Sequence, residues 1–474
     1  MQILLSLPGL DEIEAAGGVE HSLFRHVCGI PLLARVIATA GRSGGTEVLL
    51  LHPKTVPEEW LKAGLNSAVL SSIPVHTLAL DRAFDPDNPS DWQAIENRLE
   101  AKFLWLPWNY VVDKKTLSRM IEAGQASNEG VRFEWSEGSD QQEPREADHS
   151  AHRSPELPAV IIKEKLTVRS TAFRRVLAAE KSPAEAGTPN LRLDASLEVV
   201  SVPQSPGVLV CSRPTARQAE RELVRRSGKE TDGIYSKSNR WLCRPAVRWL
   251  SKTPITPNMV TFGGLAVAML SGYWFAQGYW SAYVLGALLY FGSVLIDEID
   301  GMLARLTFRE SAFGCWLETF VDYATYILLF GGMTIGLYRE SGPVWLAFGG
   351  LLLFGTVTSF FVVSYQRKLA TDPDRPNEYL GRIHRRLEAD SGNLLSRFGR
   401  YTEFLIRKAA FGYWVLIFSV LGGLKIFFLL AAFGSNIVWP MALSFNRLFR
   451  RPTSGTPLGE SGQPLYSPRA EEGR

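Results

Sequence analysis

Residues 288–325 read LLYFGSVLIDEIDGMLARLTFRESAFGCWLETFVDYAT, a stretch that carries acidic residues within strongly apolar surroundings. A charged group near hydrocarbon costs about 2.5–3.5 kcal/mol on insertion scales, so a cluster of such groups usually marks a functional site. Asp297 and Asp300 lie three residues apart, and Glu318 and Asp322 lie four apart, so each pair shares one helix face. Two antiparallel helices would bring the four carboxylates together.

Carboxylates gathered in this way need positive charge beside them. Oxygen ligands favour Mg²⁺, Mn²⁺ or Ca²⁺, so divalent cations are the expected partners. Gly301 and Ala304 lie on the same face as the aspartates and keep the helix thin, so a nucleotide or another helix can approach closely. A purely structural alternative pairs the acids with Arg305 and Arg309 in a helix bundle. That alternative accounts for two charges and leaves the spacing unexplained.

The chain around this stretch is dominated by apolar runs of membrane-spanning length. The six expected spans are 258–278, 280–297, 315–337, 343–364, 409–423 and 426–445. Alternate connections hold only Arg339 and Lys425 as basic residues, whereas the others are rich in arginine. The positive-inside rule then predicts an integral membrane protein with both termini in the cytoplasm. The N-terminal MQILLSLPGL lacks the basic region and cleavage site of a signal peptide, and we interpret it as a buried strand.

The N-terminal part has a different pattern, in which short apolar runs alternate with amphipathic stretches. Strands are expected at 2–7, 47–52, 75–80 and 102–105, and helices at 31–40, 58–63, 91–101 and 114–123. Strands that alternate with helices predict an α/β domain with a mainly parallel sheet. The polar residues 136–158 predict a flexible excursion, after which order is expected to return at 158–168, with helices near 171–180 and 215–227.

Length and composition agree with a chain of several parts. At 474 residues the chain is too long for one ordinary core. The expected parts are a cytoplasmic α/β domain at 1–228, an interfacial segment at 229–256, an all-α six-helix transmembrane bundle at 257–450 and a disordered tail at 451–474. The four cysteines are far apart and form no C-x-x-C pair, which argues against a disulfide framework or a zinc ribbon and suits a reducing compartment.

The interfacial segment is basic and aromatic. Arg240, Arg244 and Arg248 recur every four residues among tryptophans and leucines, which predicts a helix on the membrane surface with its arginines toward lipid phosphates. A flank that obeys the positive-inside rule explains the same residues equally well. Pro245 leaves open whether this segment is one helix or two short ones.

The acidic stretch has a fixed spacing, Asp297-x2-Asp300-Gly301-x2-Ala304-Arg305-x8-Gly314-x3-Glu318-x3-Asp322. It resembles the signature of the CDP-alcohol phosphatidyltransferase family, D-x2-D-G-x2-A-R-x8-G-x3-D-x3-D. The stretch TPITPNMVT at 253–261 is also similar to the family's approach to its first span, and the resemblance covers about residues 230–450. It implies an enzyme of phospholipid biosynthesis that moves a phosphatidyl or phospho-alcohol group from a CDP-activated donor to an alcohol and releases CMP.

The resemblance also implies roles for single residues. Asp297, Asp300, Glu318 and Asp322 would hold two Mg²⁺ or Mn²⁺ ions that bridge the donor diphosphate. Asp322 would also act as the general base on the acceptor hydroxyl, which attacks the β-phosphorus. The nucleotide pocket would be lined by Asp297, Gly301, Ala304, Arg305 and Gly314. The family has Asp where this chain has Glu318, whose extra methylene could shift or weaken one metal.

The expected partners follow from the same resemblance. They are a CDP-linked lipid or CDP-alcohol donor, an alcohol or phospho-alcohol acceptor and the lipid bilayer, with no nucleic acid. Arg407 and Lys408 open the fifth expected span and could bind an acceptor phosphate, although a positive-inside flank explains them as well. Small residues at 331–336 and 349–350 suggest a homodimer. The signature chooses neither the acceptor nor between CDP-diacylglycerol and a CDP-polyol.

The N-terminal domain resembles a second family. GIPLLARVI at 29–37, GTEVLLL at 45–51 and FLWLPWNYVVD at 103–113 are similar to segments of sugar-phosphate nucleotidyltransferases. The phosphate loop of that family is represented only by the scattered glycines of residues 5–26, and Asn109 stands where a metal-binding Asp is expected. The resemblance therefore implies a degenerate, non-catalytic domain with a scaffolding or regulatory role.

Two other classes of function stay open. An ion-coupled transporter would distribute intramembrane acids over several spans, whereas here they concentrate at the expected cytoplasmic ends of two adjacent spans. A non-catalytic membrane anchor that presents the soluble domain would be indifferent to the four carboxylates. Substitution of these acids separates the anchor from the enzyme.

Overall fold

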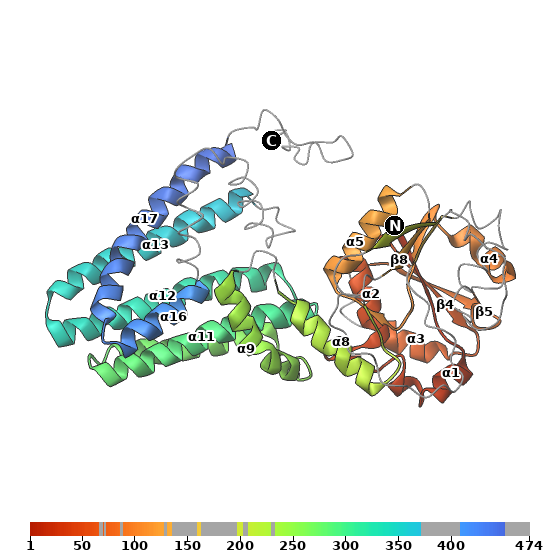
Figure 1. The fold of residues 1–474 in the computed structure, drawn as a ribbon, viewed down its shortest axis with the longest axis horizontal. Coiled ribbons are helices and arrows are strands. Elements are labelled where there is room, and N and C mark those ends of the chain that lie inside the picture. The colour runs from red at the N-terminus through yellow and green to blue at the C-terminus, as the bar shows by residue number, and fades with distance from the viewer. Residues whose placement is uncertain are drawn as a thin grey trace, which may run out of the picture. The chain divides into compact units, whose positions relative to one another are not determined.

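The computed structural model (Figure 1) describes residues 1–65, 70, 73–85, 89–127, 130–134, 159–162, 197–201, 207–228, 233–370 and 408–450. The chain divides into two compact units. The N-terminal unit comprises residues 1–228, 244–255 and 302–309, and the helical unit comprises residues 229–243, 256–301 and 310–474. The expected excursion at 136–158, the expected helix at 171–180 and the expected tail at 451–474 lie outside the described residues.

A seven-stranded sheet forms the centre of the N-terminal unit, in the order β10-β8-β9-β6-β1-β4-β5. The strands are β1 Gln2–Ser6, β4 Val48–Pro53, β5 Val75–Leu80, β6 Lys102–Trp105, β8 Gly130–Glu134, β9 Ala159–Ile162 and β10 Leu197–Ser201. All neighbouring pairs are parallel except those of β9, which runs antiparallel to both β6 and β8. The predicted α/β domain with a mainly parallel sheet is therefore confirmed.

Strands β1 and β4 are buried on both faces and largely apolar, as a covered parallel sheet requires. Leu4 of β1 pairs with Leu49 of β4 and with Trp105 of β6, so their side chains share one face. Trp92 and Ile95 of α4 (Pro89–Ile95) belong to the same buried cluster as these three side chains. Burial of this kind stabilises the unit by about 25 cal/mol per Å² of apolar surface.

Helices and short strands complete the N-terminal unit (Figure 1). They are α1 Leu10–Ala15, α2 Leu32–Arg42, α3 Glu58–Leu65, α5 Lys114–Ala126, α8 Arg213–Arg226, the hairpin β2 His26–Val27 with β3 Ile30–Pro31, and the pair β7 Tyr110–Val111 with β11 Val208–Leu209. The expected helix at 91–101 is shorter, because α4 ends at Ile95 and one 3-10 turn follows. Leu99 then adopts extended backbone and leads into β6.

Asp113 links α5 to α8. Its carboxylate caps α5 by accepting hydrogen bonds from the backbone N–H groups of Lys115 and Thr116, and it accepts a further bond from the Thr116 hydroxyl. The Arg226 guanidinium lies 2.7 Å from the same carboxylate. Burial by itself would raise the pKa of Asp113, but these hydrogen bonds and Arg226 hold the pKa below its ordinary value.

The helical unit contains a helix at each of the six expected span positions. They are α10 Pro257–Phe275, α11 Trp280–Leu306, α12 Ala312–Ser341, α13 Val344–Ala370, α16 Lys408–Val420 and α17 Leu424–Arg450. Among the described residues, three segments are long and apolar enough to cross a membrane: α11, α12 and Val344–Val362 of α13. The length and composition of these three support the prediction of membrane-spanning helices, and the count of six stays a prediction.

The segment before α10 forms one helix, α9 (Ile234–Leu250), which continues through Pro245. The alternative of two short helices is therefore wrong. Trp241 and Trp249 are exposed on α9, whereas Cys243 and Val247 are buried. This division gives α9 an apolar outer face beside its packed face, as the interfacial prediction requires.

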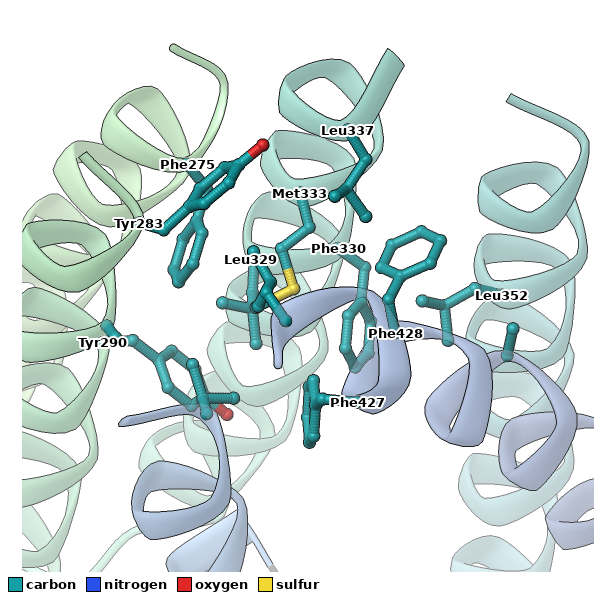
Figure 2. Close-up of a cluster of buried hydrophobic side chains, with 14 of the residues drawn as sticks. Phe275, Tyr283, Tyr290, Leu329, Phe330, Met333, Leu337, Leu352, Phe427 and Phe428 are labelled. Carbon is teal, nitrogen blue, oxygen red and sulfur yellow. The ribbon is translucent and has the colours of Figure 1, made fainter. Parts of the chain in front are cut away.

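The core of the helical unit is aromatic and aliphatic (Figure 2). Figure 2 shows Phe275, Tyr290, Phe330, Met333 and Phe428 converging from different helices, and all five side chains are buried. Because protein interiors are close-packed, such a cluster fixes the relative positions of the helices that contribute to it.

Glycines let α10 and α12 approach each other at backbone distance. A Cβ added at Gly332 would collide with the backbone of Gly272, and one at Gly336 would collide with the Phe275 carbonyl oxygen. Gly349 of α13 packs in the same way on the Thr334 side chain. The small residues expected at a dimer interface are thus partly used within one chain, and the homodimer stays a prediction.

Asp113 is expected to stabilise α5 in a pH-dependent way. Replacing Asp113 by Ala removes a cap and an ion pair and should lower the opening free energy of α5 by about 1–3 kcal/mol at pH 7. Because the folded pKa is depressed, this stabilisation is full above the unfolded value of about 3.9 and is lost as pH falls through the folded pKa.

Amide hydrogen exchange of residues 114–126, corrected for intrinsic rates, measures both effects. Asp81→Asn is the control, since its partner among the described residues is the exposed Lys54, and this variant should change nothing. An equal loss from Asp113→Ala at pH 7 and below pH 3 would contradict this account.

The close approach of α10 and α12 predicts opposite results for adjacent glycines. Gly332→Ala should lower the apparent melting temperature in detergent, because the new methyl group meets backbone and overpacking costs about 1–3 kcal/mol. Gly331→Ala is the matched control, since nothing lies near its Cβ and alanine is the better helix former. Tryptophan fluorescence during heating provides the measurement, and similar melting temperatures for the two variants would refute the contact.

Candidate active site

Two of the predicted acids meet at one lysine. Asp297 of α11 and Asp322 of α12 both contact the ammonium group of Lys408, the first residue of α16. Nζ of Lys408 lies 2.9 Å from Oδ1 of Asp297 and donates a hydrogen bond to Oδ1 of Asp322. All three side chains are at most 32% exposed. Three helices are therefore joined by one cation between two carboxylates.

Asp300 is held separately by α10. Its carboxylate is buried and lies 2.5 Å from the hydroxyl oxygen of Thr261, which is itself 3.1 Å from the Pro257 carbonyl oxygen. The start of α10 is fixed by Thr256, whose side chain accepts a hydrogen bond from the N–H of Met259. Thr261 therefore orients Asp300 toward the first turns of α10. The sequence analysis quoted the segment that contains Thr261 but gave this residue no role.

Glu318 precedes Asp322 by one turn of α12. It is half-buried, and within the part of the chain that the structure describes it makes no hydrogen bond or ion pair. A carboxylate in this state is available to a ligand. Within the described residues, the longer side chain of Glu318 is therefore not held by another protein group.

The donor set suits a divalent cation, but the carboxylates are not gathered around one point. Across the described ranges, no three or more His, Cys, Asp or Glu side chains are placed to hold a metal ion together. The expectation that two helices alone bring four carboxylates together is met only for Asp297 and Asp322. Carboxylate and hydroxyl oxygens are hard ligands that fit Mg²⁺ or Mn²⁺. Lys408 supplies the positive charge that such an ion would otherwise provide.

The residues expected at the nucleotide pocket lie in different surroundings. Gly314 is in the first turn of α12, and a Cβ there would meet Ser311 and Asn258, so it faces the start of α10. Gly301 is partly buried on α11. Ala304 and Arg305 end α11 and belong to the N-terminal unit, where Nε of Arg305 donates to the Ser227 carbonyl at 2.8 Å. Arg407 lies outside the described residues.

One ion pair was missed by the sequence analysis. Glu298 of α11 lies between the two aspartates in sequence, and its carboxylate is 2.9 Å from Nε of Arg240 on α9. Both side chains are at most 14% exposed. The prediction that Arg240 points to lipid phosphates is therefore wrong, because the residue neutralises a buried carboxylate instead. The periodic arginines and the third acid were both visible in the sequence, but their pairing was not.

Tyr290 is a second residue that the sequence analysis missed. It lies on α11 two turns before Asp297, is fully buried and is labelled in Figure 2. Its hydroxyl has no hydrogen-bond partner among the described residues. The charges of Lys408, Asp322 and Asp297 are near enough to act on it. A buried hydroxyl without a partner costs about 1–3 kcal/mol, so this group is available to a water molecule or a ligand.

Removal of Lys408 is expected to make the fold respond to divalent cations. Lys408→Met leaves two carboxylates without their cation, and loss of one partner of a buried pair costs about 3–5 kcal/mol. The melting temperature in metal-free detergent should fall, and Mn²⁺ should restore it further than it raises that of the wild type. Lys425→Met is the control, because Lys425 pairs with Glu340 at 3.0 Å in a partly exposed position. No response of Lys408→Met to Mn²⁺ would show that these carboxylates do not suit a metal.

Comparison with known proteins finds similarity in sequence between part of this chain and one family. The sequence model described as CDP-alcohol phosphatidyltransferase matches residues 254–386. A protein of Aquifex aeolicus is 33% identical over 129 residues, which are 27% of this chain and 62% of that protein. An archaetidylinositol phosphate synthase of Pyrococcus horikoshii is 30% identical over 119 residues, which are 25% of this chain and 56% of the synthase. A bifunctional IPC transferase and DIPP synthase of Thermococcus kodakarensis is 31% identical over 153 residues, which are 31% of this chain and 32% of that protein.

The matches extend over only part of this chain and of each relative. This chain covers 62% or less of each of the three relatives. A solved structure named as a glucose-1-phosphate thymidylyltransferase of Bacillus anthracis aligns with 46% of this chain and 93% of its own, at 10% identity and a TM-score of 0.31. A TM-score this low carries no argument about the fold. The family model, in contrast, matches residues 254–386, a range that includes every residue of the acidic signature.

Proposed function

We propose that the helical unit transfers a phosphatidyl or phospho-alcohol group from a CDP-activated donor to an alcohol, with release of CMP, in phospholipid biosynthesis. The observation that carries this proposal is the meeting of Asp297 and Asp322 across two helices at one cation. The signature spacing predicts that the two helices bring these acids close together, and an ion-coupled transporter path would not require it.

The chemistry assigns separate tasks to the acids. Asp297, Asp300, Glu318 and Asp322 would hold Mg²⁺ or Mn²⁺, which neutralises the donor diphosphate and stabilises the leaving CMP. Asp322 accepts the proton of the acceptor hydroxyl, whose oxygen forms a bond to the β-phosphorus as the phosphoanhydride bond breaks. Thr261 keeps the Asp300 carboxylate oriented throughout. Lys408, once released from the carboxylates, would neutralise an acceptor phosphate beside them.

The acceptor and the location are further parts of the proposal. One relative is named for archaetidylinositol phosphate synthesis, which makes an inositol phosphate the first acceptor to test. We place the protein in the bilayer with six spans and both termini in the cytoplasm, so that the acids face the compartment that contains CDP-linked donors. Support comes from the three membrane-capable helices and from the basic connections.

The N-terminal unit is proposed to be non-catalytic. At the strand end where a nucleotidyltransferase would carry metal-binding acids, Asn109 Nδ2 lies 3.4 Å from the sulfur of Cys211. Asp113, the acid nearest to this position, caps α5 and pairs with Arg226. Both groups are engaged within the protein, which supports a scaffolding or regulatory role for this unit.

A membrane anchor is the second candidate, and Lys408 is the observation that favours it. An intramolecular cation that neutralises both carboxylates permanently would leave no place for a metal or a donor. This candidate predicts no binding of CDP with or without Mn²⁺, whereas the transferase binds CDP more tightly when Mn²⁺ is present.

The transferase predicts metal-dependent release of CMP. We expect purified full-length protein in lipid nanodiscs to release CMP from CDP-diacylglycerol with one acceptor among inositol phosphate, inositol, glycerol 3-phosphate and serine. Asp322→Asn should lower kcat by about 10²- to 10⁴-fold through loss of the base. Glu340→Gln is the matched control, because it makes the same change at the other end of α12. Full activity of Asp322→Asn would exclude Asp322 as the base. If no acceptor supports release and CDP does not bind with Mn²⁺, the anchor replaces the enzyme.

A further inference from the structure

A cavity of about 550 Å³ lies within the N-terminal unit, apart from the acids of the signature. Small-molecule sites in proteins usually have volumes of about 300–1,000 Å³. The β2–β3 hairpin, α8, residues 251–255 and residues 307–309 contribute to its walls. The polar side chains of this lining are His26, Glu220, Lys252, Thr253, Thr307 and Arg309.

The lining of the cavity carries a net positive charge after the ion pairs of its one acid, Glu220, are counted. Glu220 is buried, and its carboxylate lies 3.1 Å from Nε of Arg248 and 2.9 Å from Nζ of Lys252. One acid is thus matched by two cations. Arg309 is exposed, and its guanidinium makes no hydrogen bond or ion pair within the described ranges. The cavity therefore offers a ligand the Arg309 guanidinium, which no described group engages, and the half-exposed Lys252 ammonium, which also pairs with Glu220. The hydroxyls of Thr253 and Thr307 donate to the Leu250 and Leu303 carbonyls, so towards a ligand they act as acceptors.

The walls are held in place by buried groups behind them. A Cβ at Gly29, whose φ is +74°, would run into the Ser251 carbonyl oxygen, so the hairpin touches the segment that carries Lys252. On the opposite wall, the buried guanidinium of Arg35 donates to the Leu306 carbonyl at 2.9 Å, and Arg42 donates to the Phe308 carbonyl at 2.6 Å. Both guanidinium groups also lie over the Phe308 ring. Fixed walls reduce the ordering that a ligand must impose.

We infer that this cavity binds a phosphate monoester of a small polyol, either free in solution or as the headgroup of a lipid. The phosphate binds between Arg309 and Lys252, because a guanidinium fork and an ammonium are the usual partners of a phosphate dianion. The polyol hydroxyls face Thr253, Thr307 and His26. None of these residues belongs to the signature, so the inference stands independently of the proposed transfer reaction.

The inference is tested by binding of glycerol 3-phosphate to full-length protein in detergent, without divalent cation or CDP. Isothermal titration should give a measurable Kd for glycerol 3-phosphate and none for glycerol. Arg309→Gln should raise the Kd about tenfold or more. Arg217→Gln is the matched control, since Arg217 is an exposed arginine of α8 outside the cavity, and its Kd should stay within about twofold of the wild type. Asp322→Asn should retain binding, which separates this site from the signature acids.

A second arm distinguishes the two sources of the phosphate. Nanodiscs that contain phosphatidic acid, compared with nanodiscs of phosphatidylcholine, should weaken binding of glycerol 3-phosphate if the site takes a lipid headgroup. Equal binding in both kinds of nanodisc supports a soluble ester. The inference is overturned if wild-type protein shows no binding up to about 10 mM, or if Arg309→Gln and the wild type bind equally.

Discussion

The central constraint on the helical unit is the neutralisation of carboxylates in apolar surroundings. Asp297 and Asp322 both contact the Lys408 ammonium, which neutralises them. Glu298 is also largely buried, and Arg240 neutralises its charge. An unpaired charge removed from water costs several kcal/mol, so each acid dictates the place of a cation from a distant segment. The positions of α9, α11, α12 and α16 follow from these pairs as much as from apolar burial.

Close backbone packing provides the second condition for the site. The glycines at the α10–α12 contact bring the two helices to a distance that side chains would prevent. The same helix, α10, carries Thr261 at its start, and Thr261 holds Asp300. The geometry of one acid thus depends on contacts several turns away along α10. A glycine that looks like a dimerisation motif in sequence can therefore serve the site within its own chain.

Local patterns in the sequence predicted much of this structure. Apolar runs predicted β1, β4 and β6 within about one residue, because a strand covered on both faces leaves a continuous apolar run. The more exposed edge strand β5 was also predicted, at residues 75–80. Fixed spacing predicted that Asp297 and Asp300 share one helix face and that Glu318 and Asp322 share another, because three- and four-residue intervals define a helix face. The pairs with Lys408 and Arg240 were not predictable in this way. Lys408 follows Asp322 by 86 residues and Arg240 precedes Glu298 by 58, and no periodicity connects positions so far apart.

Lys408 also connects the two candidate functions of the helical unit. A lysine that bridges two carboxylates satisfies them in the absence of substrate, and its long flexible side chain can leave them when a stronger cation arrives. In a transferase, this exchange would release an ammonium beside the newly formed metal site, where an anionic acceptor needs a partner. In an anchor, the same lysine would stay in place and the acids would serve only to join α11, α12 and α16. The difference between an enzyme and an anchor therefore depends on the relative affinity of two carboxylates for an ammonium and for a divalent ion. Glu318, which no described protein group engages, adds a further oxygen ligand on the side of the metal.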